Sequence, residues 1–380
     1  MKKIYLDNHS TTQIDPKVLK AMLPYFNEKY GNSSSRSHAF GWEAEAAIEI
    51  ARNEVSSLIG AEDDEIIFTS GATESNNLAI RGLFNANVNL KKKIITLATE
   101  HRAVLDVCKK IDKKFNKTTT YILPNSSGII DLSKFEQLLT KDVLMTSIMH
   151  VNNEIGVIQP IKEIGEICKK NNILFHVDAA QSLGKININV KEMNIDLLSI
   201  SGHKLYGPKG IGALYINNSK NIILDSLIVG GGQELNIRSG TLPVPLIVGF
   251  GSACTIAKSL MQKESQKILE LRELLINNIL AKYPNTIING HREKRVSGNI
   301  NMSFPFLNGK SIINSLPKIA VSSGSACTSS DPRPSHVLTA LGLNKLDINT
   351  TIRIGIGRFN SKEDVEIASN QILNAIKLKL

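Results

Sequence analysis

The stretch SISGHKLYGPKGIGALYI, residues 199–216, decides the fold of this 380-residue chain. Apolar residues run from 195 to 200 and again from 211 to 216, and each run is typical of a buried strand. The turn between them is rich in glycine and proline and contains Lys204. A lysine is seldom buried between core strands unless it has a partner. Lys204 therefore either extends from the turn into solvent or holds another group covalently.

Strand-like and helical patterns alternate on both sides of this stretch, from about residue 50 to 220. The alternation predicts an α/β fold whose central sheet is mixed but mostly parallel and is flanked by helices. Residues 244–283 are rich in helical pattern, and the last hundred residues repeat strands and helices on a smaller scale. We expect a large domain over residues 15–255 and a smaller α+β domain made of residues 1–14 and 256–380. The strands expected in the large domain are 66–69, 94–98, 119–123, 144–150, 174–178, 197–200 and 212–216.

The composition is that of an ordinary globular protein, with 45 Lys and Arg against 35 Asp and Glu. The net charge of +10 raises the question of nucleic acid, but no basic cluster with interleaved aromatic residues occurs, so direct nucleic-acid binding is not expected. The first residues, MKKIYLDNHSTT, contain no apolar core of a secretory signal. The apolar stretch 242–257 contains two prolines and is too short to span a bilayer. We therefore expect a cytoplasmic location and no membrane partner.

The four cysteines divide into two kinds. Cys108, Cys168 and Cys254 fall on helical apolar patterns, where a cysteine usually behaves as a small core hydrophobe. Cys327 lies in a polar Ser/Gly/Pro loop and is either a tolerated surface cysteine or a used thiol. No pair has the CxxC spacing of a zinc or dithiol site, so no metal is expected.

Polar residues follow three of the expected strands, at the edge where α/β sheets bind ligands. The Ser70–Thr73 turn precedes a helical pattern and could seat a phosphate on free backbone N–H groups, although such a turn is also an ordinary helix cap. Asp178 ends an apolar strand and is either an N-cap or the partner of a ring N–H. With Lys204 as the residue that binds an aldehyde, these are the three anchors that pyridoxal phosphate requires.

Further candidates follow other apolar runs. His101 ends a strand, where it could stack on a cofactor ring and move protons, although a lone histidine is most often structural. Asn152 follows the next strand, and a Gly-rich stretch at 230–251 carries Arg238 and Thr241 on a loop.

Many of these segments resemble those of the NifS/IscS-type cysteine desulfurases, which are class V, fold-type I pyridoxal-phosphate enzymes. The resemblance runs from residue 4 to about residue 360 and rests on several motifs in the same order. They are YLDNHSTT, YGNSS, TSGATESNN, TEHRAVLD, HVNNEIGVIQP, HVDAAQSLGK, SISGHKLYGPKGIGALY, RSGT and SSGSACTS.

The resemblance implies a role for each candidate residue. Lys204 would bind the cofactor aldehyde, Asp178 would pair with the pyridinium nitrogen, Gln181 would contact the phenolic oxygen, and His101 would stack on the ring. The phosphate would be held by Ala72, Thr73, Ser201 and His203, and by Thr241 from the other subunit of a homodimer. The substrate carboxylate would be bound by Asn152 and Arg353, Asn32 would line the site, and Cys327 would be the nucleophile.

The implied reaction converts L-cysteine to L-alanine and leaves a persulfide on Cys327. The sulfur would then pass to an acceptor protein in iron–sulfur cluster assembly, tRNA thiolation or another sulfur pathway. A mobile Gly/Ser loop suits a nucleophile that must deliver its sulfur elsewhere.

Two other interpretations remain open at this stage. A class V aminotransferase or another lyase, such as a selenocysteine lyase, needs Lys204 and Asp178 but no loop thiol, so Cys327 separates it from a desulfurase. A sulfur-carrier or tRNA-binding module on a degenerate scaffold fits the charge of +10. It does not fit the catalytic positions, all of which are filled.

Overall fold

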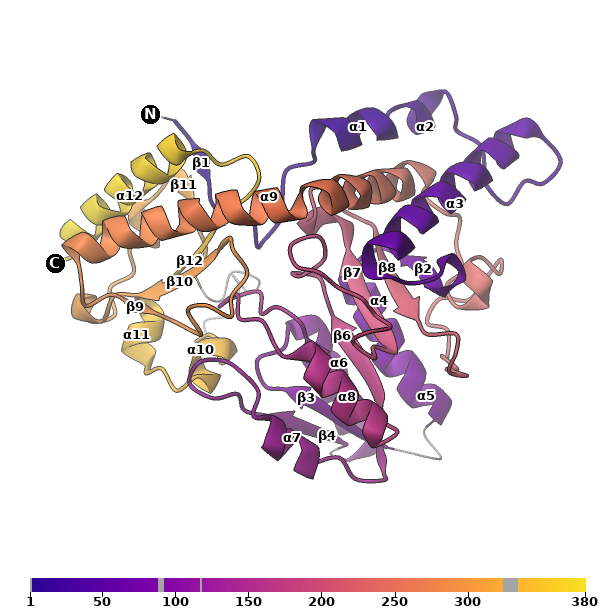
Figure 1. The fold of residues 1–380 in the computed structure, drawn as a ribbon, viewed down its shortest axis with the longest axis horizontal. Helices are drawn as coiled ribbons and strands as arrows, with labels where there is room; N and C mark the ends of the chain where they lie inside the picture. Colours follow the sequence, from indigo (N-terminus) through magenta and orange to yellow (C-terminus); the bar gives the residue numbers. More distant parts are fainter. Residues whose placement is uncertain (1, 88–91, 117, 324–333) are drawn as a thin grey trace.

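A seven-stranded sheet forms the centre of the larger body in the computed structural model (Figure 1), which describes residues 2–87, 92–116, 118–323 and 334–380. β8 is antiparallel to both of its neighbours, and the other neighbouring strands are parallel. The predicted mixed, mostly parallel sheet is therefore confirmed. In spatial order the strands are β2 (Ile66–Thr69), β8 (Gly212–Ile216), β7 (Leu197–Ser201), β6 (Leu174–Asp178), β5 (Val143–Met149), β3 (Lys93–Leu97) and β4 (Thr119–Ile122).

The sheet is buried on both faces, which explains why its strands are continuous apolar runs. All seven residues of β5 are buried. Successive side chains of a strand point to opposite faces, so Ile66 and Phe68 of β2 belong to one apolar core and Ile67 belongs to the other.

Helices cover each face. One core contains residues of α1 (Pro16–Met22), α3 (Ala39–Ile59), α7 (Leu132–Gln137) and α8 (Ile161–Lys170), and the short α2 (Pro24–Asn27) joins the first two of them. The other core contains residues of α5 (Leu83–Asn87), of α6 (Arg102–Phe115) and of the π-helical turn Leu78–Gly82, which follows α4 (Ala72–Asn77).

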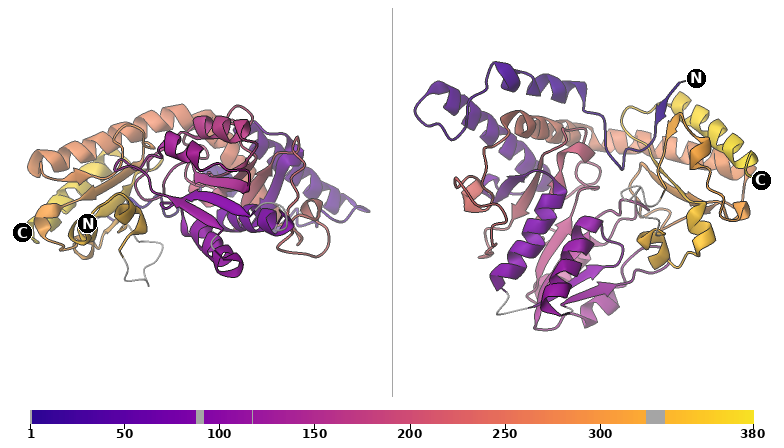
Figure 2. Two further views of the ribbon diagram at one scale, coloured as in Figure 1. Left: turned by 90° about the horizontal axis from the view of Figure 1, so that it is seen from below. Right: turned by 180° about the vertical axis from the view of Figure 1, so that it is seen from behind.

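The smaller body, on which both chain termini lie (Figure 2), has its own core, built mostly from residues of the C-terminal part of the chain. Its strands form a three-stranded antiparallel sheet and a separate parallel pair. Ile4 and Leu6, from the N-terminus, pack in this core with residues from 271 to 376. The elements are β1 (Ile4–Tyr5), β9 (Ile287–Ile288), β10 (Asn299–Ser303), β11 (Ile319–Ala320), β12 (Ile352–Gly355), α10 (His336–Ala340), α11 (Lys345–Asn349) and α12 (Lys362–Lys377).

One long helix, α9 (Val244–Lys282), joins the two bodies (Figure 1). Its residues up to Ala257 lie in the core of the large body, and those from Leu271 lie in the core of the small one. The domain limits at residues 255 and 256 stay a prediction. By length and composition alone α9 could cross a membrane, but α1, α3 and α12 pack against it, as on a core helix of a globular protein.

Two buried histidines make the sheet sensitive to acid. The ring of His176 hydrogen-bonds to Ser147 Oγ at 2.8 Å and Ser199 Oγ at 2.9 Å, on the two neighbouring strands. Burial lowers the pKa of His176 to about 3 and that of His150 to about 4. Between pH 6.5 and these values the unfolded chain binds protons that the folded chain does not, so acid favours unfolding.

We expect the free energy of unfolding to fall below pH 6.5 by about 1.4 kcal/mol per pH unit for each of these histidines. Urea unfolding at several pH values measures this slope. His176→Gln keeps hydrogen-bonding atoms but does not titrate, so it lowers the slope by about one such contribution. The exposed His38→Gln is the control and should leave the slope unchanged. An equal slope in wild type and His176→Gln would contradict the interpretation.

Candidate active site

A cavity of about 430 Å³ opens where β2, β5, β6 and β7 end. β2 and β7 both run antiparallel to β8, so their carboxyl ends lie at the same edge of the sheet as those of β5 and β6. Eight residues that the sequence pointed to line this one cavity, namely Ala72, Thr73, His101, Asp178, Gln181, Ser201, His203 and Lys204.

Lys204 ends a short 3₁₀ turn, Gly202–Lys204, that follows β7 directly. Its ammonium donates to the backbone carbonyls of His9, at 2.6 Å, and Ser10, at 2.5 Å. The N-terminal segment therefore crosses from the small body to hold the lysine at the cavity. Both of these contacts are to main-chain atoms.

Asp178 is the last residue of β6 and is 4% exposed. One carboxylate oxygen accepts from Asn76 Nδ2 at 2.8 Å, and the other accepts from the backbone N–H of Ala180 at 3.0 Å. Within the described ranges it forms no salt bridge. A buried carboxylate held only by neutral donors is poorly compensated, so it favours a ligand that brings a positively charged N–H.

The turn between β2 and α4 lies against the first residue of β8. Gly71 has φ +147°, and a Cβ on Gly212 would lie 2.7 Å from the Cα of Gly71. Glycine at 212 therefore allows the turn to approach the sheet. The backbone N–H groups of Ala72 and Thr73, in the first turn of α4, have no acceptor within the helix.

The two predicted histidines differ in what holds their rings. His101 caps α6, and its Nδ1 accepts from the backbone N–H of Ala103 at 3.1 Å, so the proton of the neutral ring is on Nε2. Burial, with a smaller contribution from Lys204, lowers the pKa of His203 to about 4. His203 therefore carries no charge near neutral pH.

Gln181 connects the cavity to the N-terminal segment. Its Oε1 accepts from His9 Nδ1 at 3.0 Å, and its Nε2 donates to the His9 carbonyl at 2.8 Å. The carbonyl of His9 thus receives both Gln181 and Lys204. One amide proton of Gln181 has no acceptor in this pair of bonds and can be offered to a ligand oxygen.

The structure corrects the choice of Asn152 as a substrate ligand. Asn152 is 1% exposed, and its Nδ2 donates to the carbonyl of Thr99 at 2.8 Å. Its Oδ1 accepts from the backbone N–H groups of Glu154 and Ile155, both at 2.9 Å. These bonds close the turn after β5, and a further bond from Nδ2 to Met149 Sδ, at 3.3 Å, occupies the other N–H of the side chain. The neighbouring Asn153 lines the cavity instead.

Arg353 lies directly behind Asn153 and is 1% exposed. Its guanidinium donates to the Asn153 carbonyl at 3.0 Å and forms an ion pair with Asp7 at 2.8 Å. A further bond reaches Ser322 Oγ at 3.2 Å, whereas the buried Nε has no partner. The predicted contact with a substrate carboxylate therefore has to compete with Asp7.

Three predicted residues lie elsewhere. Asn32 is exposed on the loop between α2 and α3, where its Oδ1 accepts from the backbone N–H of Ser34. Thr241 is exposed on the loop before α9. Cys327 lies outside the described residues. The structure does not bring Asn32 or Thr241 to the cavity of the same chain.

A family model described as "Aminotransferase class-V" matches residues 4–367. The chain belongs to the class-V aminotransferase family. The cysteine desulfurases IscS of Rickettsia prowazekii and Ehrlichia chaffeensis are 52% and 51% identical to it, over 98% of this chain and 91% of each relative. A solved structure described as a NifS-like protein superimposes with a TM-score of 0.92 at 35% identity, covering 99% of this chain and 100% of that one. The predicted family and fold class are confirmed.

Two contributors to this class-V site were missed in the sequence. Asn76 holds the Asp178 carboxylate, and the only signal for it was its place in the quoted motif TSGATESNN. The carbonyls of His9 and Ser10 hold Lys204, and backbone acceptors leave no residue-type signal at all. Asn152 and Asn153 are adjacent and of the same residue type, so the sequence alone does not indicate which of the two side chains faces the cavity.

The pair of asparagines gives a matched test. Asn152→Ala leaves two buried N–H groups and one carbonyl without partners, so we expect it to lower the free energy of unfolding by about 1–3 kcal/mol. Asn153→Ala removes no side-chain hydrogen bond to the described residues and should change stability by less than about 0.5 kcal/mol, while weakening ligand binding in the cavity. Urea unfolding and cofactor titration measure the two effects. If Asn152→Ala kept the wild-type free energy of unfolding but bound the cofactor more weakly, Asn152 and not Asn153 would be the residue that contacts the ligand.

Proposed function

We propose that this class-V enzyme is a pyridoxal-phosphate-dependent cysteine desulfurase that converts L-cysteine to L-alanine. The observation that carries the proposal is the presence, in one cavity, of Lys204 on a turn after β7 and of the Asp178 carboxylate at the end of β6, which within the described residues is held by neutral donors. Both class-V aminotransferases and cysteine desulfurases depend on pyridoxal phosphate. The identity to IscS proteins, at 52% over nearly the whole chain, supports the choice of reaction.

The residues present suit that cofactor. Among the described residues the Asp178 carboxylate has no cation beside it, and the buried Asn76 Oδ1 has no hydrogen-bond partner, so the end of β6 can accept more donors than these residues supply. When bound, pyridoxal phosphate accepts electrons from the bonds at the α-carbon of an amino acid. Asp178 would keep the ring nitrogen protonated, and Lys204 would hold the aldehyde. The phenolic oxygen would be held by Gln181. The phosphate oxygens would be held by Ala72, Thr73, Ser201 and His203.

His101 and Lys204 are the groups in the cavity that can move protons. Nε2–H of His101 can donate, because its Nδ1 is occupied by the backbone N–H of Ala103. Lys204 would hold the aldehyde of the bound cofactor and, as an amine, could also move a proton. We assign the substrate carboxylate to Asn153 and Arg353, with Arg353 exchanging Asp7 for the ligand.

The sulfur step requires a reactive thiol, and the other cysteines are unsuited to it. Cys108, Cys168 and Cys254 are fully buried, and burial raises the pKa of Cys108 and of Cys168 to about 12. We propose that the Cys327 thiolate attacks the sulfur of L-cysteine. The carbon–sulfur bond breaks, its electron pair goes to carbon, and a proton completes L-alanine. The product Cys327 persulfide retains the sulfur, so no external oxidant is needed.

The flanks of the segment that contains Cys327 are anchored beside the cavity. Before it, Ser322 pairs through its backbone with Arg353, at 3.0 Å and 2.6 Å. After it, Ser335 Oγ donates to Glu154 at 2.6 Å, and His336 Nε2 bonds to the carbonyl of Glu100 at 2.9 Å, one residue before His101. These anchors support the role of Cys327, because the described residues on both sides of it in the sequence lie near the site.

We further propose a homodimer, an acceptor protein for the sulfur, and a cytoplasmic location. The three described cysteines are free thiols, which suits a reducing compartment. Large apolar side chains gather around the connection between α2 and α3, which protrudes from the body in Figure 1. The exposed ones there are Leu23, Phe26, Tyr30, Phe40 and Trp42. Exposed apolar patches of this kind mark interfaces, and a partner's Thr241 and Asn32 could then complete the site.

The reaction is tested by measuring L-alanine released from L-cysteine with a reductant. Wild type should release alanine, and Cys327→Ala should lose more than about 10³-fold of the rate while keeping the colour of the bound cofactor. Cys168→Ala, which removes a buried thiol, is the control and should remain active. If Cys327→Ala were as fast as wild type, the chain would be a different pyridoxal-phosphate lyase or an aminotransferase.

The dimer is tested with Phe40→Asp, which puts a charge on a half-exposed ring of the proposed interface. We expect the dissociation constant to rise by about thirtyfold or more, since a central aromatic residue contributes about 2 kcal/mol. Sedimentation velocity measures the assembly, and activity should fall with it because Thr241 comes from the partner. Leu378→Asp, at an exposed position near the C-terminus, is the control. A monomeric wild type with full activity would refute the proposal.

A further inference from the structure

A second carboxyl group is held beside the strand that Asp178 ends. Glu100 lies in the turn between β3 and α6, directly before His101, and is 0% exposed. Its Oε1 accepts from the backbone N–H of Met149 at 2.7 Å. Met149 ends β5, lines the active-site cavity and is the register partner of Asp178. Glu100 thereby ties the turn that carries His101 to the end of β5, and the two carboxyl groups are held at neighbouring strand ends.

The two carboxyl groups differ in their hydrogen bonds. Asp178 accepts one bond on each oxygen, from Asn76 Nδ2 and from the backbone N–H of Ala180. Glu100 accepts one bond on Oε1, and its buried Oε2 has no hydrogen-bond partner among the described residues. Donors stabilise the charged form of a carboxyl group, and a buried charge without a partner costs far more than a buried hydroxyl without one. The pattern favours a charge on Asp178 and a proton on Oε2 of Glu100.

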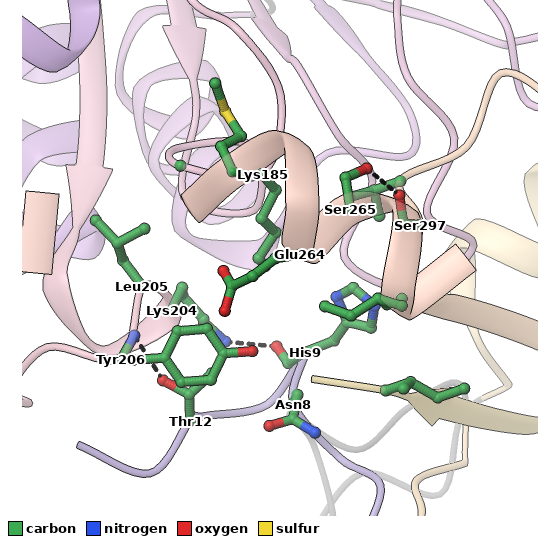
Figure 3. A pocket seen from close by; sticks show the side chains of 16 residues that line it. Asn8, His9, Thr12, Lys185, Lys204, Leu205, Tyr206, Glu264, Ser265 and Ser297 are labelled. Atoms are coloured by element: carbon green, nitrogen blue, oxygen red, sulfur yellow. Dashed lines mark hydrogen bonds between the residues drawn. The ribbon is translucent and has the colours of Figure 1, made fainter. Parts of the chain in front are cut away.

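Other acids in the interior are matched by a cation, unlike Glu100. Two buried ion pairs are Asp196–Lys220, at 2.6 Å, and Glu234–Arg52, at 2.8 Å. Glu264 is partly buried in a small cavity of about 40 Å³ that Lys185 also lines (Figure 3), and Arg358 Nη2 donates to its Oε2 at 3.1 Å. Glu100 forms no salt bridge with any described residue, so a charge on it would have no counter-ion within this part of the chain.

We propose that Glu100 is a positioning residue that keeps its proton near neutral pH, so that the two carboxyl groups at the ends of β5 and β6 carry one negative charge, on Asp178. The consequence for the cofactor rests on the proposed function of Asp178. Two acids in one poorly solvated place disfavour each other's charge, and different environments decide which of them ionises. Burial raises the pKa of Glu100 well above its ordinary value; the bond from Met149 opposes this and the charge of Asp178 adds to it.

The histidines around Glu100 supply no compensating charge. Burial lowers the pKa of His150, which follows the last residue of β5, to about 4. Burial also lowers the pKa of His336, whose Nε2 donates to the Glu100 carbonyl at 2.9 Å. His101, the next residue along the chain, accepts a backbone N–H on its Nδ1, so its ring is neutral in this cap.

The side chains of α6 leave Glu100 uncompensated as well. Burial raises the pKa of the Cys108 thiol to about 12, so this thiol is neutral. The guanidinium of Arg102 lies 3.9 Å from the exposed carboxylate of Asp106, one turn further along the helix. Among the described residues, the charge that acts on Glu100 is therefore that of Asp178, which has the same sign.

The first test compares wild type with Glu100→Gln, whose amide keeps an oxygen for the N–H of Met149 and does not titrate. In wild type the folded chain keeps a proton that the unfolded chain releases above a pKa of about 4.5, so rising pH favours unfolding. Relative to Glu100→Gln, the unfolding equilibrium constant of wild type should rise by up to about tenfold per pH unit between about pH 5 and 7. Urea unfolding of the full chain without cofactor measures this, with the exposed Glu166→Gln as the control that should follow wild type. The same pH dependence in wild type and Glu100→Gln would overturn the proposal.

The second readout is the infrared C=O stretch of a protonated carboxylic acid, measured at pH 7 on the same cofactor-free protein. Wild type should show this band, and Glu100→Gln should lose the share of one carboxyl group. The band should persist in Asp178→Asn, because Asp178 is the charged member of the pair. A wild type without the band would refute the proposal, and this result does not depend on whether Glu100→Gln folds.

The third readout is the apparent dissociation constant of pyridoxal phosphate, from an absorbance titration. Glu100→Gln replaces one neutral group with another and should change this constant by less than about threefold. Asp178→Asn removes the charge and should raise it by about tenfold or more. Affinity lost in Glu100→Gln and kept in Asp178→Asn would place the charge on Glu100 and contradict the proposal. If wild type bound no cofactor, the proposed function would fail, while the unfolding and infrared measurements would still decide whether Glu100 keeps its proton.

Discussion

The buried carboxylate of Asp178, which has no cation beside it among the described residues, is the constraint on which the site depends. A buried carboxylate without a cation is unfavourable by several kcal/mol, and in the described part of the chain the hydrogen bonds from Asn76 and from the backbone N–H of Ala180 oppose that cost. Asn76 belongs to α4, so the same bond ties the turn at residues 70–73 to the end of β6. The sheet order then sets β5, β6 and β7 side by side. Asp178 and Ser201 therefore end strands, and Lys204 follows β7 within three residues, so their positions depend closely on strand register.

The N-terminal segment makes the reactive lysine dependent on the small body. Ile4 and Leu6 pack in the small core, and a few residues later the carbonyls of His9 and Ser10 hold Lys204. Gly355 permits this crossing, because a Cβ there would lie 2.8 Å from the backbone nitrogen of Asn8. A shift of the small body would thus move the acceptors of Lys204, which links the arrangement of the two bodies to the site.

Sequence reasoning found the strands because they are buried on both faces and are read as short apolar runs. β2, β6 and β8 begin and end at the predicted residues. It also found the side chains that follow the strands, because residue type indicates their chemistry. It failed where tertiary contacts decide, since the choice between Asn152 and Asn153 depends on which side chain closes the turn. The pairing of Arg353 with Asp7 joins residues 346 positions apart, and no local pattern indicates it.

The charges around Lys204 explain why Glu264 needs its own partner. If this carboxylate were free, it would lie in the same small cavity as Lys185 and would stabilise its ammonium as an ordinary ion pair. Arg358 prevents this by binding both oxygens of Glu264 while Asp15 satisfies the guanidinium. Two carboxylates, Glu264 and Asp15, thus share the single guanidinium of Arg358. Glu264 is therefore held in an ion pair of its own and does not act as the partner of Lys185.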